Sequence, residues 1–182
     1  MDIFVIYCAS PIGILRVSGT MDCVTSVTFL EGWEENHACL RARTVCPSVL
    51  SECSEQLKEY FSGKRRDLRA LRIAPTGTEF QRSVWRTLLA VPWGESMTYG
   101  ELGRRCGYAR AARAVGAAVA CNPLAIVIPC HRVVPTGAAV GGYAWGAWRK
   151  RWLLRHEGVK TSSPYPSAGG GKGGVGITRE VG

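Results

Sequence analysis

The 182-residue sequence lacks the features that would place it in or across a membrane. No uninterrupted run of roughly 18 apolar residues is present, so we expect no membrane-spanning helix. The first residues, Met1 to Val5, lack the basic stretch of a signal peptide, and Asp2 opposes one. The sequence therefore predicts a protein that is not secreted and that stays in a reducing compartment, where its thiols remain free.

Cysteine pairs of the metal-binding kind are also missing. Eight cysteines are present, but no two have the Cys-x-x-Cys spacing of common zinc sites. A weak candidate for zinc binding is His37-x-Cys39. We therefore expect scattered thiols, no metal site and no cofactor.

Acidic residues are scarce in the second half of the chain. Residues 1–63 carry a net charge of −4, residues 64–160 carry +12, and the remaining tail adds +1. A basic region of this size favours a polyanionic partner, and the excess of arginine over lysine suits phosphate contacts. The alternative is a basic face that only contacts solvent.

The first half has the pattern of a small antiparallel sheet followed by a helix. Apolar and β-branched runs at 3–8, 13–18 and 24–30 are separated by turn residues, which is typical of hairpins. Pro47 opens a helix that Gly63 closes. Its apolar residues share one face: Val49, Leu50, Cys53, Leu57, Tyr60 and Phe61. The basic stretch 64–69 is expected to be a linker, with a domain boundary at residue 74.

The second half is predicted to be mostly helical, so the fold class is α+β. Thr76-x-x-Glu79 and Thr98-x-x-Glu101 each have the spacing of a capping box and predict two helix starts. Residues 110–120 predict another helix, which ends at Asn122-Pro123. Two short helices joined by a glycine-containing turn are typical of a helix-turn-helix.

The helix at 110–120 has few long side chains. Apart from Arg110 and Arg113, its outward positions are nearly all alanine or glycine. A helix is roughly 10–12 Å across with ordinary side chains, whereas the minor groove of B-DNA is about 6 Å wide. Small residues therefore suit either close approach to a narrow groove or tight packing against neighbouring helices.

The segment from Ile126 to Val134 has the strongest chemical signal in the chain. An apolar run is stopped by Pro129, which restricts the backbone, and a thiol and an imidazole follow at Cys130 and His131. A cysteine held beside a potential base is suited to covalent chemistry. The alternative is a buried cysteine that acts as a small apolar residue.

Seven short motifs occur in order in the second half. They are Phe80-Gln-x-x-Val-Trp85, Thr98-Tyr-Gly-Glu101, Arg113-Ala-Val-Gly116, Asn122-Pro123, Ile128-Pro-Cys-His-Arg-Val-Val134, Gly142-Tyr-x-Trp-Gly146 and His156-Glu-Gly158. Residues 75–160 thereby resemble the O6-alkylguanine-DNA alkyltransferases, also called methylated-DNA–protein-cysteine methyltransferases. Residues 1–74 resemble the family's N-terminal, ribonuclease H-like sheet domain more loosely, chiefly through Ser10-Pro-Ile-Gly13.

The resemblance implies repair of DNA by direct reversal. An alkyl group would pass from O6 of guanine, and also from O4 of thymine, to Cys130 in a single turnover. In the family, the histidine matching His131 acts on the cysteine through a water molecule, and the glutamate matching Glu157 holds that imidazole. A lowering of the thiol pKa by about two units would correspond to roughly 2.7 kcal/mol. Adjacent residues of an extended segment point to opposite faces, which leaves room for that water.

The resemblance also assigns the other site residues. Asn122 would tie the end of the helix to the cysteine loop, and Tyr99 would donate a proton to the base. Arg113 would fill the space left by a nucleotide flipped out of double-stranded DNA. The further DNA contacts would be Tyr99, Gly100, Ala112 and Thr136. The pocket wall would come from Val140, Gly141, Tyr143, Ala144 and Trp145, with a backbone donor to O6 near Ala144.

Domain limits and setting follow as expectations. We expect a sheet domain at 1–74, an alkyltransferase domain at 75–160 and a disordered glycine-rich tail at 161–182. We expect a monomer, cytoplasmic and associated with the nucleoid in a prokaryote, which Trp145-Gly146 favours, or nuclear in a eukaryote. The alternatives are a protein that binds alkylated bases without repairing them, a helix-turn-helix transcriptional regulator, and a thiol enzyme unrelated to DNA.

Overall fold

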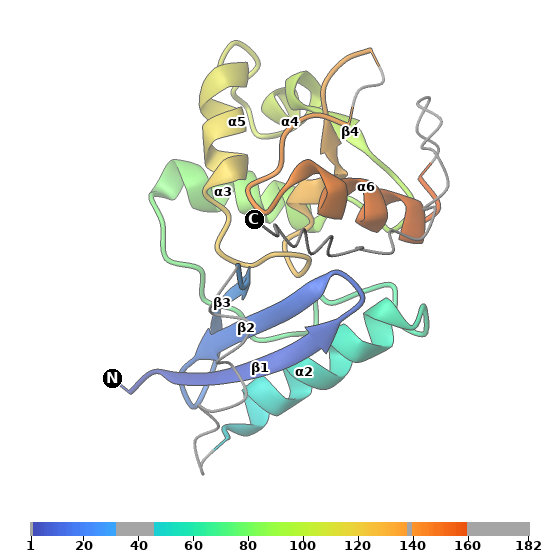
Figure 1. The fold of residues 1–182 in the computed structure, drawn as a ribbon. Coiled ribbons are helices and arrows are strands. Elements are labelled where there is room, and N and C mark those ends of the chain that lie inside the picture. Colours follow the sequence, from blue (N-terminus) through green and yellow to red (C-terminus); the bar gives the residue numbers. More distant parts are fainter. Residues whose placement is uncertain (1, 32–45, 138–139, 160–182) are drawn as a thin grey trace, which may run out of the picture.

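The computed structural model describes residues 2–31, 46–137 and 140–159, and they form two adjoining lobes. A sheet with one helix makes the N-terminal lobe, and a group of helices makes the C-terminal lobe (Figure 1). The α+β class predicted from the sequence is confirmed. Within the described ranges, no helix is long and apolar enough to cross a membrane.

The sheet has three antiparallel strands in the order of the chain. They are β1 (Phe4–Ser10), β2 (Gly13–Gly19) and β3 (Val24–Phe29). The turn between the first two strands is closed by the Ser10 hydroxyl, which donates to the Gly13 carbonyl at 2.5 Å. All three strands lie at nearly the predicted positions, because the turn residues between the apolar runs set their ends.

Helix α2 (Ser48–Phe61) covers one face of the sheet (Figure 1). It begins directly after Pro47 and ends before Gly63, whose φ of +75° suits glycine at a helix end. Its buried face includes most of the predicted apolar positions: Val49, Leu50, Cys53, Leu57 and Tyr60. Phe61 is only half-buried.

The residues after the basic stretch 64–69 are bound to the sheet. Leu68 and Leu71 are buried. The amide of Val24 donates to the Arg72 carbonyl at 2.8 Å, and the amide of Ala74 donates to the Val24 carbonyl at 2.9 Å. The basic stretch 64–69 itself forms no helix or strand, and the residues that follow it attach the chain to the first lobe.

The N-cap of helix α3 (Glu79–Leu89) lies later in the chain than predicted. Its capping box is formed by Thr78 and Gln81, not by Thr76 and Glu79. With Thr78 as the cap, Glu79 lies in the first turn, where the helix dipole favours a negative charge. The second predicted box, Thr98 with Glu101, is confirmed at the start of α4 (Tyr99–Arg105).

Helices α4 and α5 (Ala112–Ala120) are joined by residues 106–111, in a helix-turn-helix arrangement. Helix α5 begins at Ala112, so Arg110 lies in the turn rather than on the helix as predicted. Both helices pack on α3. The indole of Trp85 in α3 donates to the Ala118 carbonyl of α5 at 2.8 Å, which fixes the two helices to each other.

The chain after α5 connects the two lobes. The amide of Val27 in β3 donates to the Pro123 carbonyl at 2.9 Å, and the amide of Ala125 donates to the Val27 carbonyl at 2.8 Å. A short 3-10 helix, η2 (Cys130–Arg132), follows, and β5 (Val133–Val134) pairs in parallel with β4 (Met97–Thr98). The expectation that the segment is extended at Cys130 is therefore wrong, because the chain turns there.

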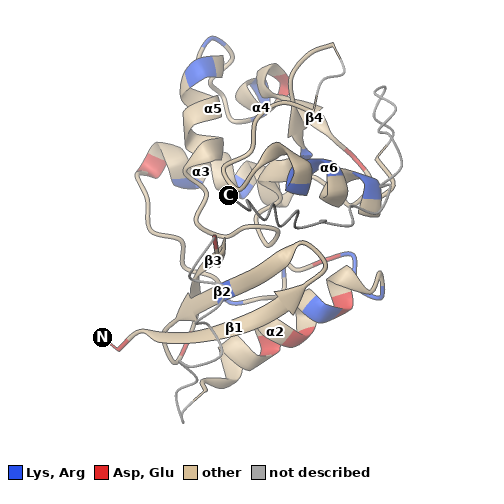
Figure 2. Ribbon diagram, in the orientation of Figure 1, with Lys and Arg blue, Asp and Glu red and all other residues tan. Residues whose placement is uncertain are grey.

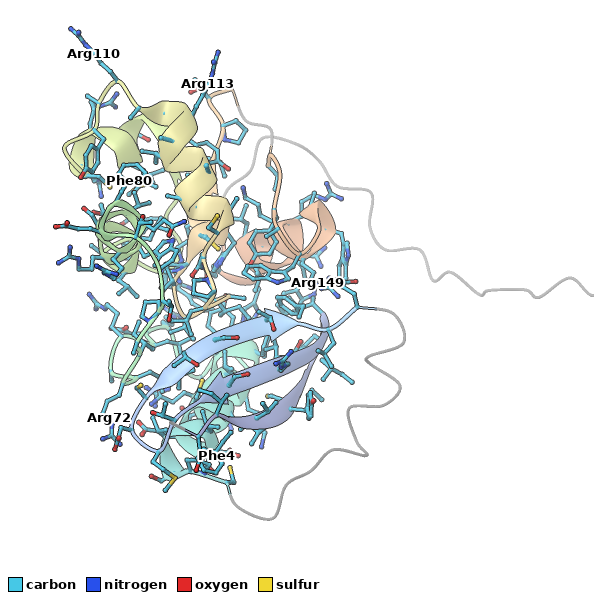
Figure 3. The ribbon with its side chains drawn as sticks, turned by 90° about the vertical axis from the view of Figure 1, so that its left-hand side faces the viewer. Phe4, Arg72, Phe80, Arg110, Arg113 and Arg149 are labelled. Carbon is cyan, nitrogen blue, oxygen red and sulfur yellow. The ribbon has the colours of Figure 1, made fainter. Side chains whose placement is uncertain are left out.

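Helix α6 (Ala147–His156) ends the described part of the second lobe and is fixed to the first by Arg149. The buried guanidinium of Arg149 donates to the Ile12 carbonyl at 2.9 Å, pairs with Glu31 and lies over the Phe29 ring. Figure 3 shows Arg149 directly above the sheet. The two lobes therefore share polar contacts as well as apolar core.

Gly19 is the glycine of the sheet whose replacement we expect to be costly. A Cβ atom there would lie 2.3 Å from the Cys23 carbonyl oxygen and 2.9 Å from a methyl carbon of Leu50. Gly19→Ala should therefore lower the free energy of unfolding by about 1–3 kcal/mol, because backbone must move to admit the methyl group. Urea unfolding measures this. Gly100→Ala is the control, since its nearest contact would be 3.8 Å. Equal stability of the two variants would contradict the expectation.

Candidate active site

Asn122 holds Cys130 in place. The side-chain amide of Asn122 donates to the Cys130 sulfur at 3.0 Å and to the Ile128 carbonyl at 2.9 Å, and its oxygen accepts from the Leu124 amide at 3.0 Å. Both Asn122 and Cys130 are 3% exposed. The predicted link between the helix end and the cysteine is therefore present as a set of hydrogen bonds.

The backbone before the cysteine is strained. Ile126 has a φ of +70°, the one positive value among the described residues other than glycine. The left-handed region is rarely adopted by a β-branched residue, and such strain persists only where the surroundings hold it. Ile126 and Ile128 are fully buried, and the packing around them keeps the strained backbone in place.

Burial works against ionisation of the Cys130 thiol. Burial raises the pKa of Cys130, while the Asn122 amide, the Lys150 ammonium and the Tyr143 hydroxyl act in the opposite direction. The resemblance implied a pKa lowered by His131, whereas the groups that act to lower it here are Asn122, Lys150 and Tyr143. The sulfur therefore has to lose its proton as it reacts.

A cavity of about 330 Å³ lies in front of the sulfur. Its wall combines residues of α4, α5 and the loop before α6: Tyr99, Gly116, Val119, Ala120, Cys130, Gly142, Tyr143 and Ala144. The glycine and alanine of α5 leave the space open, because longer side chains there would fill it. This use of small residues was not among the explanations drawn from the sequence.

The residues expected in the pocket wall divide into two groups. Tyr143 and Ala144 line the cavity. Val140 is buried, Trp145 packs against Phe29 with ring centroids 6.2 Å apart, and Gly141 has a φ of +74°. These three residues belong to the loop but do not line the cavity. Gly142 lines the cavity in place of Gly141.

His131 and Glu157 form a fully buried pair. The His131 Nε2 atom is 2.9 Å from the Glu157 Oε1 atom, and neither side chain is exposed. Burial favours a raised pKa for Glu157, but His131 and Arg132 outweigh it and hold that pKa well below its usual range. Burial lowers the pKa of His131, with Glu157 opposing the shift. Burial therefore favours a neutral imidazole beside the Glu157 carboxylate.

The tautomer of His131 follows from this pairing. A carboxylate only accepts hydrogen bonds, so Nε2 carries the hydrogen and Nδ1 carries the lone pair. The Nδ1 atom is buried and has no hydrogen-bond partner. The ring thus presents one unused acceptor, which is what a general base requires.

Arg132 and Lys150 also belong to the site, although sequence analysis missed them. Arg132 donates to both oxygens of Glu157 at 2.8 Å and to the Val91 carbonyl at 2.5 Å. Lys150 is 1% exposed and donates to the Gly142 carbonyl at 3.1 Å. Burial lowers the pKa of Lys150 to about 8, with Cys130 acting against the shift. Their charge suggested only phosphate contacts, and nothing in the sequence signalled that they would be buried.

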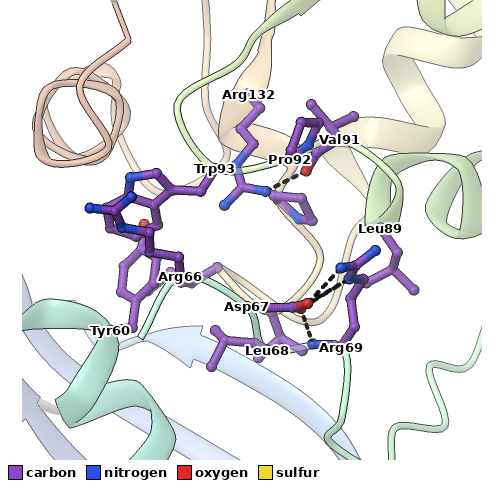
Figure 4. Close-up of a pocket in the computed structure, with 13 residues that line it drawn as sticks. Tyr60, Arg66, Asp67, Leu68, Arg69, Leu89, Val91, Pro92, Trp93 and Arg132 are labelled. Carbon is purple, nitrogen blue, oxygen red and sulfur yellow. Dashed lines mark hydrogen bonds and ion pairs between the residues drawn. The ribbon is translucent and has the colours of Figure 1, made fainter. Parts of the chain in front are cut away.

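A second cavity, of about 260 Å³, adjoins the same network on another side. Tyr60, Trp93 and Arg132 line it, and Arg66 and Asp67 of the segment after α2 close it (Figure 4). None of the predicted site residues lies in its wall. The cavity at Cys130 is therefore the one that places the thiol beside an open space.

The expected DNA-contacting residues lie around the helix-turn-helix and one neighbouring loop. Arg113 is exposed in the first turn of α5, and Figure 3 shows it and Arg110 pointing away from the molecule. Ala112 and Thr136 are exposed, and Gly100 is half-buried in the first turn of α4. Basic residues dominate this lobe, whereas α2 of the other lobe carries mixed charge (Figure 2).

The described residues contain no group of three or more histidine, cysteine or acidic side chains placed to hold a metal ion. The cysteines in the described ranges are free thiols. The His37-x-Cys39 lead and the glycine-rich tail at 161–182 lie outside the described residues.

Two family models match the chain, one for each lobe. Residues 3–75 match the ribonuclease-like domain of 6-O-methylguanine DNA methyltransferase, and residues 79–159 match its DNA-binding domain.

Curated relatives agree with this match. A methylated-DNA–protein-cysteine methyltransferase of Methanosarcina acetivorans is 39% identical over 158 residues, which is 82% of this chain and 94% of the relative. The enzyme of that name from Shigella flexneri is 51% identical over 105 residues. That match spans 58% of this chain and 61% of the relative.

Solved structures of similar fold come from Mycobacterium tuberculosis. Its O6-methylguanine methyltransferase has a TM-score of 0.75 at 37% identity, with 86% of this chain and 93% of that chain covered. The same enzyme in complex with DNA has a TM-score of 0.74 at 37% identity, with 85% and 92% covered. On both family models and the full-length relatives, the chain belongs to the methylated-DNA–protein-cysteine methyltransferase family.

Proposed function

We propose that this protein removes alkyl groups from O6 of guanine in DNA, and from O4 of thymine, by transferring them to its own Cys130. The observation that carries the proposal is a tethered thiol that lines a cavity and is followed in the chain by a histidine in a buried imidazole–carboxylate pair. The names of its relatives supply the substrate class.

The burial of the sulfur requires that the base comes to it. At 3% exposure, Cys130 does not reach a guanine stacked inside a duplex. Enzymes that act on bases solve this by flipping the nucleotide out, at a cost of a few kcal/mol. We assign the vacated space to Arg113, which is exposed at the start of α5, and close approach to the minor groove to the small, exposed residues of that helix.

The transfer is a displacement at a saturated carbon. The Cys130 sulfur forms a bond to the alkyl carbon as the bond from that carbon to O6 breaks. The thiol proton passes to His131 Nδ1 through a water molecule, and the guanine leaves as a neutral base once Tyr99 donates a proton that the imidazolium restores. Burial raises the pKa of Tyr99, with Cys130 adding to the shift, so its hydroxyl keeps a proton to donate.

The product limits the protein to one turnover. A thioether is a poor leaving group, and the residues that line the described cavity include no second thiol. Each molecule therefore acts as a stoichiometric reagent as well as an enzyme.

Each lobe of the chain has its own role in the proposed function. We assign residues 1–74 to the sheet domain and residues 75–160 to alkyl transfer and DNA binding. The protein would act as a monomer where the cell keeps its DNA.

Intact-mass spectrometry tests alkyl transfer directly. After incubation with duplex DNA that carries O6-methylguanine, the protein should gain one methylene, mapped to Cys130, in a one-to-one ratio. Cys130→Ala should gain none, whereas Cys121→Ala, which removes an exposed thiol, should behave as wild type. DNA binding without any mass gain would support the alternative of a protein that only recognises alkylated bases. Many turnovers per molecule would contradict the single-use mechanism.

The role of Arg113 is tested by separating flipping from chemistry. Arg113→Ala should slow alkylation by duplex DNA by at least about tenfold, because stabilisation of the flipped state is lost. Its reaction with free O6-benzylguanine should be unchanged. Arg110→Ala is the matched control: Arg110 also points into solvent but lies in the turn, so we expect weaker, salt-dependent binding only. Equal losses in both variants would reduce Arg113 to a phosphate contact.

A further inference from the structure

Helix α2 of the N-terminal lobe contributes a side chain to the active-site network. The Tyr60 hydroxyl donates to Glu157 Oε1 at 2.7 Å, and both residues are buried. The two residues are 97 positions apart in the chain. Every site residue assigned from the sequence lies in the second half, so this contact joins the first lobe to the chemistry of the second.

The phenol ring of Tyr60 is fixed on several sides. Its centroid lies 5.1 Å from that of Trp93, 5.3 Å from that of Phe61 and 5.4 Å from that of His156. The His156 Nε2 atom donates to the Tyr60 carbonyl at 2.8 Å. These contacts hold the ring whether or not it carries a hydroxyl, so the hydroxyl is not needed to place α2.

Glu157 Oε1 is shared by three donors. They are the Tyr60 hydroxyl at 2.7 Å, His131 Nε2 at 2.9 Å and Arg132 Nη2 at 2.8 Å. Each donor draws negative charge from the oxygen. A stronger bond from Tyr60 therefore leaves less charge on Oε1 to attract a proton on His131.

We propose that Tyr60 is a positioning residue that sets how strongly Glu157 attracts His131, so that the N-terminal lobe tunes the base that accepts the thiol proton. This inference rests on the proposed alkyl transfer, in which His131 is that base. Without the hydroxyl, Oε1 would attract the imidazolium more strongly. The imidazole would then gain a proton at a higher pH and cease to act as a base.

The surroundings of His131 allow the effect to be assigned. The charged and titratable groups that act on its ring are Glu157 and Lys150 from α6 and its end, Arg132 from its own turn, and Tyr60 through Glu157. Burial and the nearby carboxylate raise the pKa of Tyr60 well above its usual value, so it remains a donor at neutral pH. Tyr60→Phe removes one donor and leaves the other groups in place.

The pH dependence of single-turnover alkylation tests the proposal. In full-length Tyr60→Phe, the acid limb of the rate profile between about pH 5 and 8 should move up by roughly 0.5–1 unit. The rate above the limb should stay within about twofold of wild type, because the thiol and the cavity are untouched. Tyr7→Phe is the control: it makes the same change at a half-buried tyrosine of β1 in the same lobe, and its profile should match wild type.

Several outcomes would overturn the proposal. A rate that falls equally at every pH would make Tyr60 a structural residue only, and so would loss of folding in Tyr60→Phe.

In a Glu157→Gln background, Tyr60→Phe should cause no further shift, because the hydroxyl acts through the carboxylate. NMR titration of the His131 ring gives the same shift without any alkylation. It therefore separates failure of this inference from failure of the proposed function.

Discussion

The buried carboxylate of Glu157 is the interaction on which the rest of the site depends. An ionised carboxylate away from water is tolerated only when charged and hydrogen-bonding partners surround it. Here those partners come from two separate parts of the chain: Tyr60 of α2, and His131 with Arg132 of the turn at the cysteine. Glu157 directly follows α6, where the helix dipole opposes a negative charge, so the guanidinium of Arg132 is needed to offset both costs.

This arrangement gives the cysteine turn its rigidity. Arg132 is fixed by Glu157 and by the Val91 carbonyl, and Asn122 fixes Cys130 from the other side. The strained backbone at Ile126 is held between them. A nucleophile placed so firmly needs little reorganisation when a substrate carbon arrives, which is how positioning lowers a reaction barrier. In the proposed reaction the thiol is then the proton donor and the neutral His131 is the proton acceptor.

The sequence was sufficient where local signals decide the structure. The strands, α2 and the capping box at Thr98 followed from turn residues, apolar periodicity and spacing. The capping box of α3 was misplaced because Thr76 and Thr78 carry nearly the same signal, and only the folded chain selects one. The segment at Cys130 forms a turn, but it was predicted to be extended because an apolar run before a proline resembles a strand.

The rest of the site depends on contacts between distant segments. Tyr60 looked like one more apolar position of α2, and Arg132 and Lys150 looked like phosphate contacts in a basic region. Their burial depends on how α2 and α6 pack together, which no local pattern encodes. The same is true of Gly116 and Ala120, whose small size opens the cavity in front of the cysteine.

The central claim is that burial keeps His131 neutral and that Glu157 holds its hydrogen on Nε2, which leaves the lone pair on Nδ1. Nitrogen-15 NMR of the histidine rings in the DNA-free protein tests it most directly. At neutral pH the account predicts, for His131, a protonated Nε2 and an unprotonated Nδ1. An imidazolium, or a hydrogen on Nδ1 instead, would contradict it.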